Sequence, residues 1–352
     1  MKKIIIGFFF LLNFNANAQF EFHYPSWYKD RTYQKLIVKV GNQSNPYTQK
    51  IMQIIKDNWN VCPIEFYTDK FDKNLLVDGN IFLNFERYTI ASQYVRDYGN
   101  NGGISRGNVN YNDYYYLNFW VIDKSYKPKK DWWDYKYTIA KSEFYLKLIG
   151  MGEEEYKAFK IDLETLIGIR ESVFRIEREE MYPKEFDFTG LNFQLQYLNG
   201  MEGNIKNMIQ FVNNQVKNKA EKDFFSDTKN ESELSKLKKE TLFIPNYWYG
   251  EKGTILENLK DGDKYISAHV KFLNDLQKSY PYKSEVISRS ELDKKILNAN
   301  EDFYYLNYVQ SSADKIICII NGKTGEVIYS SVTKNSYRLK EKDLEKIAKL
   351  IK

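Results

Sequence analysis

Hydrophobic and polar positions in the first third of the chain follow two spacings, one typical of strands and one typical of helices. A β-branched run at 34–40 predicts a strand. An Asn-Pro pair then opens the segment 45–59, in which apolar residues recur every three or four positions, as on one face of a helix. Short apolar runs at 64–67 and 81–85 predict two further strands. Strand, helix and strand in this order indicate a parallel βαβ unit.

The middle of the chain changes from strand patterning to helix patterning. Gly, Asn and Ser crowd residues 98–113, which predicts a plain loop rather than a phosphate cradle, because no helix pattern follows it. Strands are predicted at 114–122 and 136–147. Residues 153–181 then place apolar positions three and four apart between charged ones, which predicts a long amphipathic helix, and 201–222 predicts a second one.

The last third returns to short strands alternating with helices. Residues 226–239 are polar and rich in Lys, Glu and Ser, and they predict a linker or an exposed helix. An Asn-Gly-Lys-Thr-Gly-Glu segment between two apolar runs predicts a hairpin turn. The other elements predicted here are strands at 241–244, 285–287, 303–309, 315–320 and 327–330, and helices at 263–279, after Ser290 and at 340–351.

Two distant segments of the chain resemble each other. Residues 65–85 and 285–308 both contain a short strand that starts with Glu, then an Asp-Lys segment, then a run with Leu-Asn and an aromatic residue. The offset drifts from 220 at the Glu to 223 at the Leu, which requires small insertions. One interpretation is a duplicated α/β domain that holds a ligand or partner between its halves. The other is a chance resemblance, which a second match of 114–119 to 303–308 at a different offset favours.

These patterns predict an α/β fold, with a mixed α+β arrangement as the alternative. We expect two βαβ-type lobes separated by a helical insertion. If the chain holds no duplication, it is instead one α/β domain with a helical excursion. The predicted boundaries are a signal peptide at 1–18, an N-terminal lobe at 19–150, the insertion and linker at 151–238, and a C-terminal lobe at 239–352.

The N-terminus has the pattern of an export signal. Lys2 and Lys3 precede an apolar run at 4–14, and an Ala-Asn-Ala segment supplies the small residues that signal peptidase recognises, so cleavage is predicted between Ala18 and Gln19. The apolar run is shorter than the roughly 20 residues that span a bilayer, which disfavours an uncleaved anchor. No Cys follows the cleavage site, so we expect a periplasmic or secreted protein, not a lipoprotein, without a membrane span after cleavage.

Composition and charge exclude several classes of function. The chain carries a net charge of +5, which falls to +3 when the two signal-peptide lysines are removed, and it has no long block of like charge. This balance argues against nucleic acid as a partner. Only two His and two Cys are present, so neither a His/Cys metal site nor a disulfide scaffold is expected, and no cofactor is predicted. Cys62 and Cys318 are expected to be free thiols, with a disulfide between them as the alternative.

Sequence motifs for catalysis are absent from the chain. The Gly-Lys-Thr at 322–324 lacks the first Gly of a P-loop, since Ile317 stands there, and a strand rather than a helix is predicted to follow. His23 lies near the predicted mature N-terminus and His269 lies within a predicted helix, so neither has the setting of a catalytic base. The catalytic residues therefore stay unknown. The 47 acidic residues leave a pair of catalytic carboxylates open.

Aromatic residues in predicted loops are the candidate binding residues. Trp and Tyr on loops form stacking surfaces for glycans or proteins, although the same rings also pin loops to a core. We therefore expect a non-enzymatic envelope protein that binds an envelope protein or glycan. The alternatives are an exported hydrolase with paired carboxylates, and a structural subunit of an envelope assembly with its interface on 153–222. The candidate ligand-binding residues are Trp132, Trp133, Tyr247, Trp248 and Tyr249.

Overall fold

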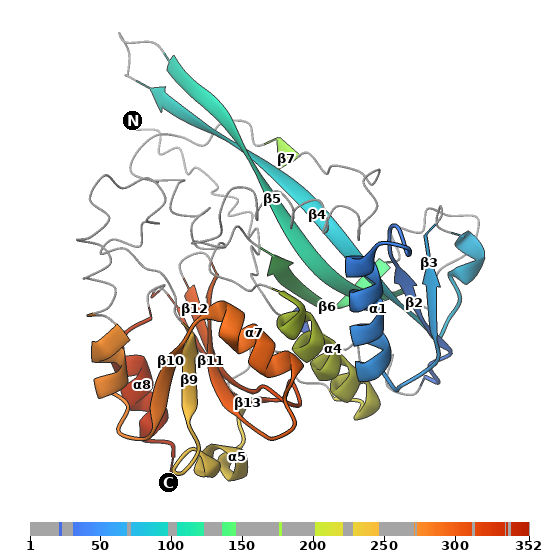
Figure 1. The fold of residues 1–352 in the computed structure, drawn as a ribbon. Coiled ribbons are helices and arrows are strands. Elements are labelled where there is room, and N and C mark those ends of the chain that lie inside the picture. Colours follow the sequence, from blue (N-terminus) through green and yellow to red (C-terminus); the bar gives the residue numbers. More distant parts are fainter. Residues whose placement is uncertain are drawn as a thin grey trace, which may run out of the picture.

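The computed structural model shows a mixed α/β protein with two β-sheets and helices packed against them (Figure 1). The α/β class predicted from the sequence is therefore confirmed. The structure describes residues 21–22, 31–68, 72–97, 104–122, 136–145, 176–177, 201–220, 228–245, 271, 273–311, 314–334, 336 and 339–351.

The first sheet, sheet A, contains the strands β1 (Glu21–Phe22), β2 (Lys35–Lys39), β3 (Ile64–Tyr67), β4 (Asn80–Asp97), β5 (Ile104–Ile122), β6 (Lys136–Tyr145) and β7 (Ile176–Glu177). Their order is β3-β2-β4-β5-β6-β1, and β7 pairs with β4 outside this path. Strand β2 pairs in parallel with both β3 and β4, whereas β4, β5, β6 and β1 pair antiparallel in turn. The predicted parallel βαβ unit is therefore confirmed.

The second sheet, sheet B, contains the strands β8 (Thr228–Lys229), β9 (Leu242–Pro245), β10 (Ser284–Ile287), β11 (Tyr304–Ser311), β12 (Asp314–Asn321) and β13 (Val327–Thr333). Their order is β10-β9-β11-β12-β13-β8. Strand β9 pairs in parallel with β10 and β11, and the other pairs are antiparallel. The hairpin predicted from the Asn-Gly-Lys-Thr-Gly-Glu segment joins β12 to β13 and is confirmed.

The two sheets share one topology. Each central parallel strand lies between the two strands that follow it along the chain, and each sheet then continues through two antiparallel strands to a short strand that precedes the central one in sequence. Strands β1 to β6 thus correspond in order and direction to β8 to β13.

The strand register relates the two sheets residue by residue. Ile37 in β2 lies opposite Glu65, and Phe243 in β9 lies opposite Glu285. On their other sides, the same two central residues lie opposite Phe82 and Tyr305. The offsets of 220 and 223 from the sequence comparison therefore join equivalent positions of the two sheets. The shared topology is a structural fact, and descent from a duplicated domain stays a prediction.

The described helices are α1 (Pro46–Asn58), α4 (Met201–Lys217), α5 (Glu231–Lys236), α7 (Arg289–Leu297) and α8 (Glu341–Ala348), with a 3-10 turn η2 (Lys73–Leu75) and helical backbone at 273–278. The Asn-Pro start of α1 is confirmed, because the Asn45 side chain accepts hydrogen bonds from the backbone N–H groups of Tyr47 and Thr48. Helix α4 packs against both α1 and α7 (Figure 1).

Alternate residues of the central strands enter two separate hydrophobic clusters. Leu36 and Val38 of β2 face the larger cluster, which also contains residues of sheet B and of α4, whereas Ile37 joins a smaller cluster with Phe82 and Trp120. Both faces of sheet A are therefore buried near β2. The larger cluster joins the two sheets into a common core.

Two predictions from the middle of the chain are wrong where the structure describes them. The loop predicted at 98–113 is strand from Ile104 onward, paired along its length with β4. Gly, Asn and Ser have a local preference for turns, but the backbone pairing of β5 with β4 overrides this preference. Within the helix predicted at 153–181, the described residues 176–177 form β7, parallel to β4. The rest of that predicted helix lies outside the described residues.

Smaller differences concern where elements begin and end. Helix α4 ends at Lys217 rather than at residue 222. The segment 226–239, predicted as a linker or an exposed helix, contains β8 and the helix α5, and its Leu234 and Leu237 are fully buried. Helix α7 begins at Arg289, two residues earlier than expected, because Ser288 rather than Ser290 caps it. Capping hydrogen bonds, which composition does not reveal, decide such boundaries.

Candidate functional site

The residues proposed from the sequence as a binding site lie outside the described residues. These are the five loop aromatics Trp132, Trp133, Tyr247, Trp248 and Tyr249. The predicted signal peptide with Ala18 and Gln19, and both histidines, also lie outside them. A site must therefore be sought among the described polar clusters and strands, and three features stand out there.

The first feature is a cluster of polar groups where α1, α4 and α7 meet, which we call the junction cluster (Lys50, Glu202, Gly203 and Asp293). Asp293 of α7 is 7% exposed, and its Oδ1 accepts a hydrogen bond of 2.7 Å from the backbone N–H of Gly203. The negative charge of Glu202, the residue before Gly203, also acts on this carboxyl group. Glu202 in turn binds the Lys50 ammonium of α1 at 2.8 Å.

The electrostatics of this cluster favour a protonated Asp293. Burial raises the pKa of Asp293 to about 8, and the charge of Glu202 adds to this, against the opposing effects of the Gly203 N–H and the Lys50 charge. At neutral pH the protonated form of Asp293 is therefore favoured. Gly203 is required at the contact, because a Cβ there would lie 2.7 Å from Asp293 Oδ1.

Both carboxyl groups of the junction cluster are engaged in contacts between helices. Asp293 of α7 accepts a hydrogen bond from the Gly203 N–H of α4, and Glu202 of α4 binds Lys50 of α1. The cluster thus joins three helices, and it does not carry the paired-carboxylate interpretation.

Further hydrogen bonds attach α4 to its neighbours along its length. They connect side chains of α4 to backbone or side-chain groups at the end of α1, at the end of α7, in β11 and in the β12–β13 turn. These pairs are Lys206 with Ile296 at 2.8 Å, Asn207 with Gly322 at 3.0 Å and Tyr305 at 3.1 Å, Gln210 with Lys323 at 2.9 Å, and Asn213 with Asn60 at 2.8 Å.

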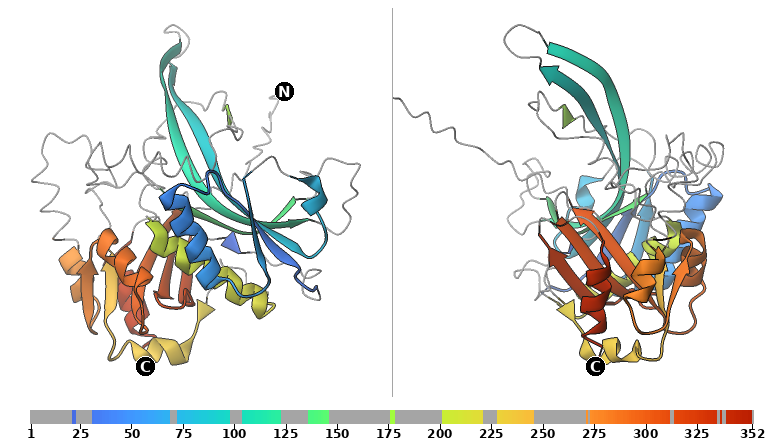
Figure 2. Two further views of the ribbon diagram at one scale, coloured as in Figure 1. Left: turned by 45° about the vertical axis from the view of Figure 1, so that its right-hand side comes forward. Right: turned by 90° about the vertical axis from the view of Figure 1, so that its left-hand side faces the viewer.

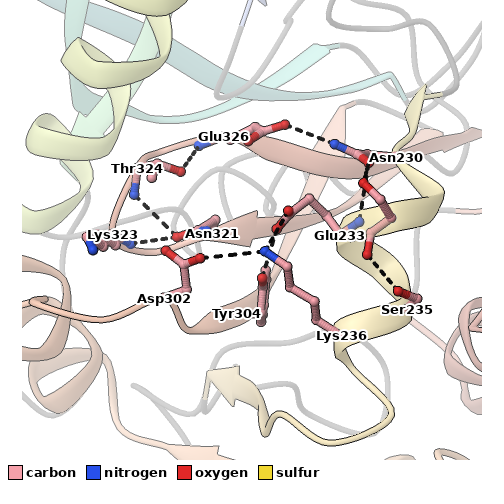
Figure 3. A network of polar contacts seen from close by, with 11 residues as sticks. Asn230, Glu233, Ser235, Lys236, Asp302, Tyr304, Asn321, Lys323, Thr324 and Glu326 are labelled. Atoms are coloured by element: carbon pink, nitrogen blue, oxygen red, sulfur yellow. Dashed lines mark hydrogen bonds and ion pairs between the residues drawn. The ribbon is translucent and has the colours of Figure 1, made fainter.

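The second feature is a polar network at the edge of sheet B (Figure 3). Tyr304 donates a hydrogen bond of 2.8 Å to Glu233, and Lys236 lies 2.7 Å from the same carboxylate and 3.7 Å from Asp302. Burial, and then the Glu233 hydrogen bond, raise the pKa of Tyr304. Nearby, Asn230 caps α5. The network clamps α5 onto the sheet, which is a structural role.

The Gly-Lys-Thr segment lies in the same region and also has a structural role. Asn321 accepts hydrogen bonds from the backbone N–H groups of Lys323 and Thr324, which closes the turn (Figure 3). Gly325 has a φ of +70°, and a Cβ there would lie 2.4 Å from the Asn207 carbonyl oxygen of α4. Strand β13 follows, so the exclusion of a P-loop is confirmed.

The two cysteines are free, as predicted. Cys318 is fully buried in β12, and burial raises the pKa of its thiol to about 12. Burial also raises the pKa of Cys62. Neither thiol is therefore activated as a nucleophile, because the thiolate is the reactive form.

The third feature is a long two-stranded ribbon formed by β4 and β5. Strand β2 pairs with β4 only as far as Asn84, and β6 pairs with β5 only from Tyr115 onward. Beyond these points β4 and β5 continue together to the pair Asp97 and Ile104, and Figure 2 shows them leaving the body of the two sheets. At about 3.3 Å per residue, this part of β4 is roughly 40 Å long. Apart from β4 and β5 themselves, β7 is the only described strand that pairs with this part of the ribbon.

The β11–β12 hairpin of sheet B is the equivalent of the β4–β5 hairpin, and it has no such ribbon. There the corresponding strands end at the pair Ser311 and Asp314, with two residues between them. The offset of 223 places Ser311 at Tyr88 of β4, and Tyr88 lies opposite Tyr114 of β5. Residues 89–113 of sheet A therefore take the place of two residues in sheet B. The ribbon is an elaboration that the shared topology does not require.

The sequence pattern contained no clear signal for either the junction cluster or the ribbon. The carboxyl pair unites residues 91 positions apart on two helices, so no motif spacing reveals it. The ribbon was concealed by loop-like composition. The one sequence signal for the ribbon was that the matched segments 65–85 and 285–308 are followed by stretches of unequal length before the next predicted strand.

Two kinds of feature, a metal-binding group and a membrane-spanning helix, were sought among the described residues and not found there. Within the described ranges, His, Cys, Asp and Glu side chains form no group of three or more that would hold a metal ion. None of the helices described has both the length and the apolar run that a bilayer crossing needs. Comparison of the chain with protein-family models, curated proteins and solved structures finds no match.

Proposed function

We propose that this chain is an exported, non-enzymatic envelope protein that binds another protein of the envelope, and that the β4–β5 ribbon is its binding element. The observation that carries this proposal is the extension of the hairpin at 89–113, which has no counterpart in sheet B. An element that the shared topology does not need is a candidate for a function of its own.

The low stability of an isolated two-stranded ribbon supports the proposal that a partner packs against it. Such a ribbon is marginally stable in water on its own, and packing against another surface stabilises it. Strand edges are also natural templates for a further strand, and proteins commonly guard them with Lys or Pro. The ribbon sequence at 85–97 and 104–114 contains neither Lys nor Pro. We therefore expect a polypeptide partner that pairs with or packs along the ribbon.

The charge and composition of the ribbon indicate the kind of partner surface. Its three Arg are balanced by three acidic residues, so it has no field that selects a strongly charged partner. Tyr and Asn are frequent in it, as in protein-binding loops, where they supply contact area and hydrogen bonds at low entropic cost. An uncharged, polar protein surface fits these properties better than a nucleic acid.

Site-specific photo-crosslinking tests the proposal. A photoreactive amino acid is placed at Asn110 in the ribbon, and a matched control carries it at Ser311, the end of the equivalent hairpin of sheet B. In the native envelope, we expect the ribbon variant to capture one protein of defined mass and the control to capture none. Equal capture at both positions, or capture at neither, contradicts the proposal.

A further inference from the structure

The hydrogen bonds of sheet A determine which way each backbone N–H group of the sheet points. Along a strand, the N–H and C=O groups of one residue point to one neighbouring strand, and those of the next residue point to the other. The Leu36 N–H donates to the Pro63 carbonyl oxygen, 2.8 Å away on the β3 side of β2. The backbone groups of Ile37 therefore point to the opposite side, where β4 lies.

This alternation can be followed across β4 to β5. Ile37 lies opposite Phe82 of β4, and in a parallel pair it bonds the residues on either side of Phe82. The Phe82 backbone therefore points to Trp120 of β5, which lies opposite it. Because this pairing continues without a shift into the ribbon, the even-numbered residues of 110–120 point to β4. The odd-numbered residues of 109–113 point to the other edge of β5.

That edge, which we call the outer edge of β5 (residues 104–114), continues a ladder that another strand begins. Strand β6 pairs with the same side of β5 from Tyr115 to Ile122. On the opposite side of the ribbon, β7 pairs in parallel with Ile90 and Ala91 of β4 (Figure 1). The ribbon thus already takes one added strand on β4, whereas no described strand pairs with the outer edge of β5.

We propose that the partner binds by β-augmentation, as an extended segment of its chain that pairs with the outer edge of β5 and continues sheet A beyond the end of β6. This inference rests on the proposed function, and it adds which edge binds and which groups form the bonds. Segment 104–114 contains one Arg, one Asp and neither Lys nor Pro. A partner strand without net charge therefore fits it, and no Lys or Pro in the segment blocks strand addition.

Proline substitution on the outer edge tests the pairing. The Tyr111 N–H points to this edge, so Tyr111→Pro removes a donor to the partner and leaves the β4–β5 bonds in place. Tyr111→Ala removes the same side chain and keeps the N–H. Each variant carries the photoreactive amino acid at Asn110 and is cross-linked in the native envelope. We expect Tyr111→Pro to lower the partner cross-link at least about tenfold relative to Tyr111→Ala.

Hydrogen–deuterium exchange at single-residue resolution gives a second readout on the unsubstituted protein. The complex isolated from the envelope is compared with the protein freed of its partner. We expect binding to slow exchange of the N–H groups of residues 111 and 113 at least about tenfold, because they bond the added strand. The N–H groups of 110 and 112 already bond β4, so their exchange is expected to change much less.

Several outcomes overturn the pairing. A partner that Tyr111→Pro retains as well as Tyr111→Ala does so, and so does equal protection of odd and even residues. A cross-link within the chain, or to a second copy of it, shows a different occupant of the edge. Failure of the unsubstituted ribbon to capture any protein is a different result, because it removes the proposed function itself.

Discussion

At the scale of single residues, the polar clusters found among the described residues join one element to another. The Gly-Lys-Thr-Gly turn shows this most clearly, because a sequence that suggests phosphate binding is used to dock a hairpin on α4. Gly325 makes this contact with a left-handed backbone and no room for a Cβ beside Asn207. Sequence alone excluded the P-loop correctly, but it did not reveal what the second Gly is for.

This docking predicts a strong dependence on Gly325. The change Gly325→Ala forces a side chain into the left-handed region, at roughly 1–2 kcal/mol, and adds the clash with the Asn207 carbonyl. We expect urea unfolding to show a loss of at least about 2 kcal/mol in the free energy of unfolding. Thr324→Ala, in the same turn, removes the hydrogen bond that the Thr324 hydroxyl accepts from the Glu326 N–H. It serves as the control and is expected to change the free energy of unfolding by less than about 1 kcal/mol. Equal effects of the two changes contradict the docking role.

At the scale of elements, the sequence predicted most described helices and strands because their apolar spacing is regular. The strand at 34–40, the helix from Asn45 and the hairpin before β13 were all found in this way. Errors arose where distant backbone pairing or side-chain capping decided the structure. Strand β5 is held by β4 despite its turn-rich composition, and α7 begins where Ser288 meets Glu291.

The start of α7 gives a test at this scale. Ser288 accepts from the Glu291 backbone N–H, and the Glu291 side chain accepts from the Ser288 backbone N–H, so the two form a capping box. Ser288→Ala is expected to lower the free energy of unfolding by about 1 kcal/mol. The matched change Ser290→Ala, inside the helix, is expected to be near neutral. Thermal and urea unfolding measure both, and a larger loss at Ser290 contradicts the assigned start.

At the scale of the whole molecule, two sheets of one topology share a core, and α4 links their helices. A repeated unit was one of two interpretations of the matched segments 65–85 and 285–308, and the register places these segments at equivalent strand positions. The ribbon was not predicted, because its existence depends on pairing between strands rather than on any local pattern. The ribbon is the candidate binding element because it extends far beyond the equivalent hairpin of sheet B.

The most direct test of this account removes the ribbon and keeps the sheet. Residues 89–113 are replaced by Ser-Ala, the two residues that connect β11 and β12 at the equivalent position. A control replaces that Ser-Ala pair of sheet B with Asn-Gly and leaves the ribbon intact. Each protein is isolated from its own envelope and examined by native mass spectrometry, with circular dichroism to confirm folding. We predict a bound partner protein on the wild type and the control, and a folded monomer without it for the shortened variant. A shortened variant that keeps the partner at wild-type stoichiometry would contradict the account.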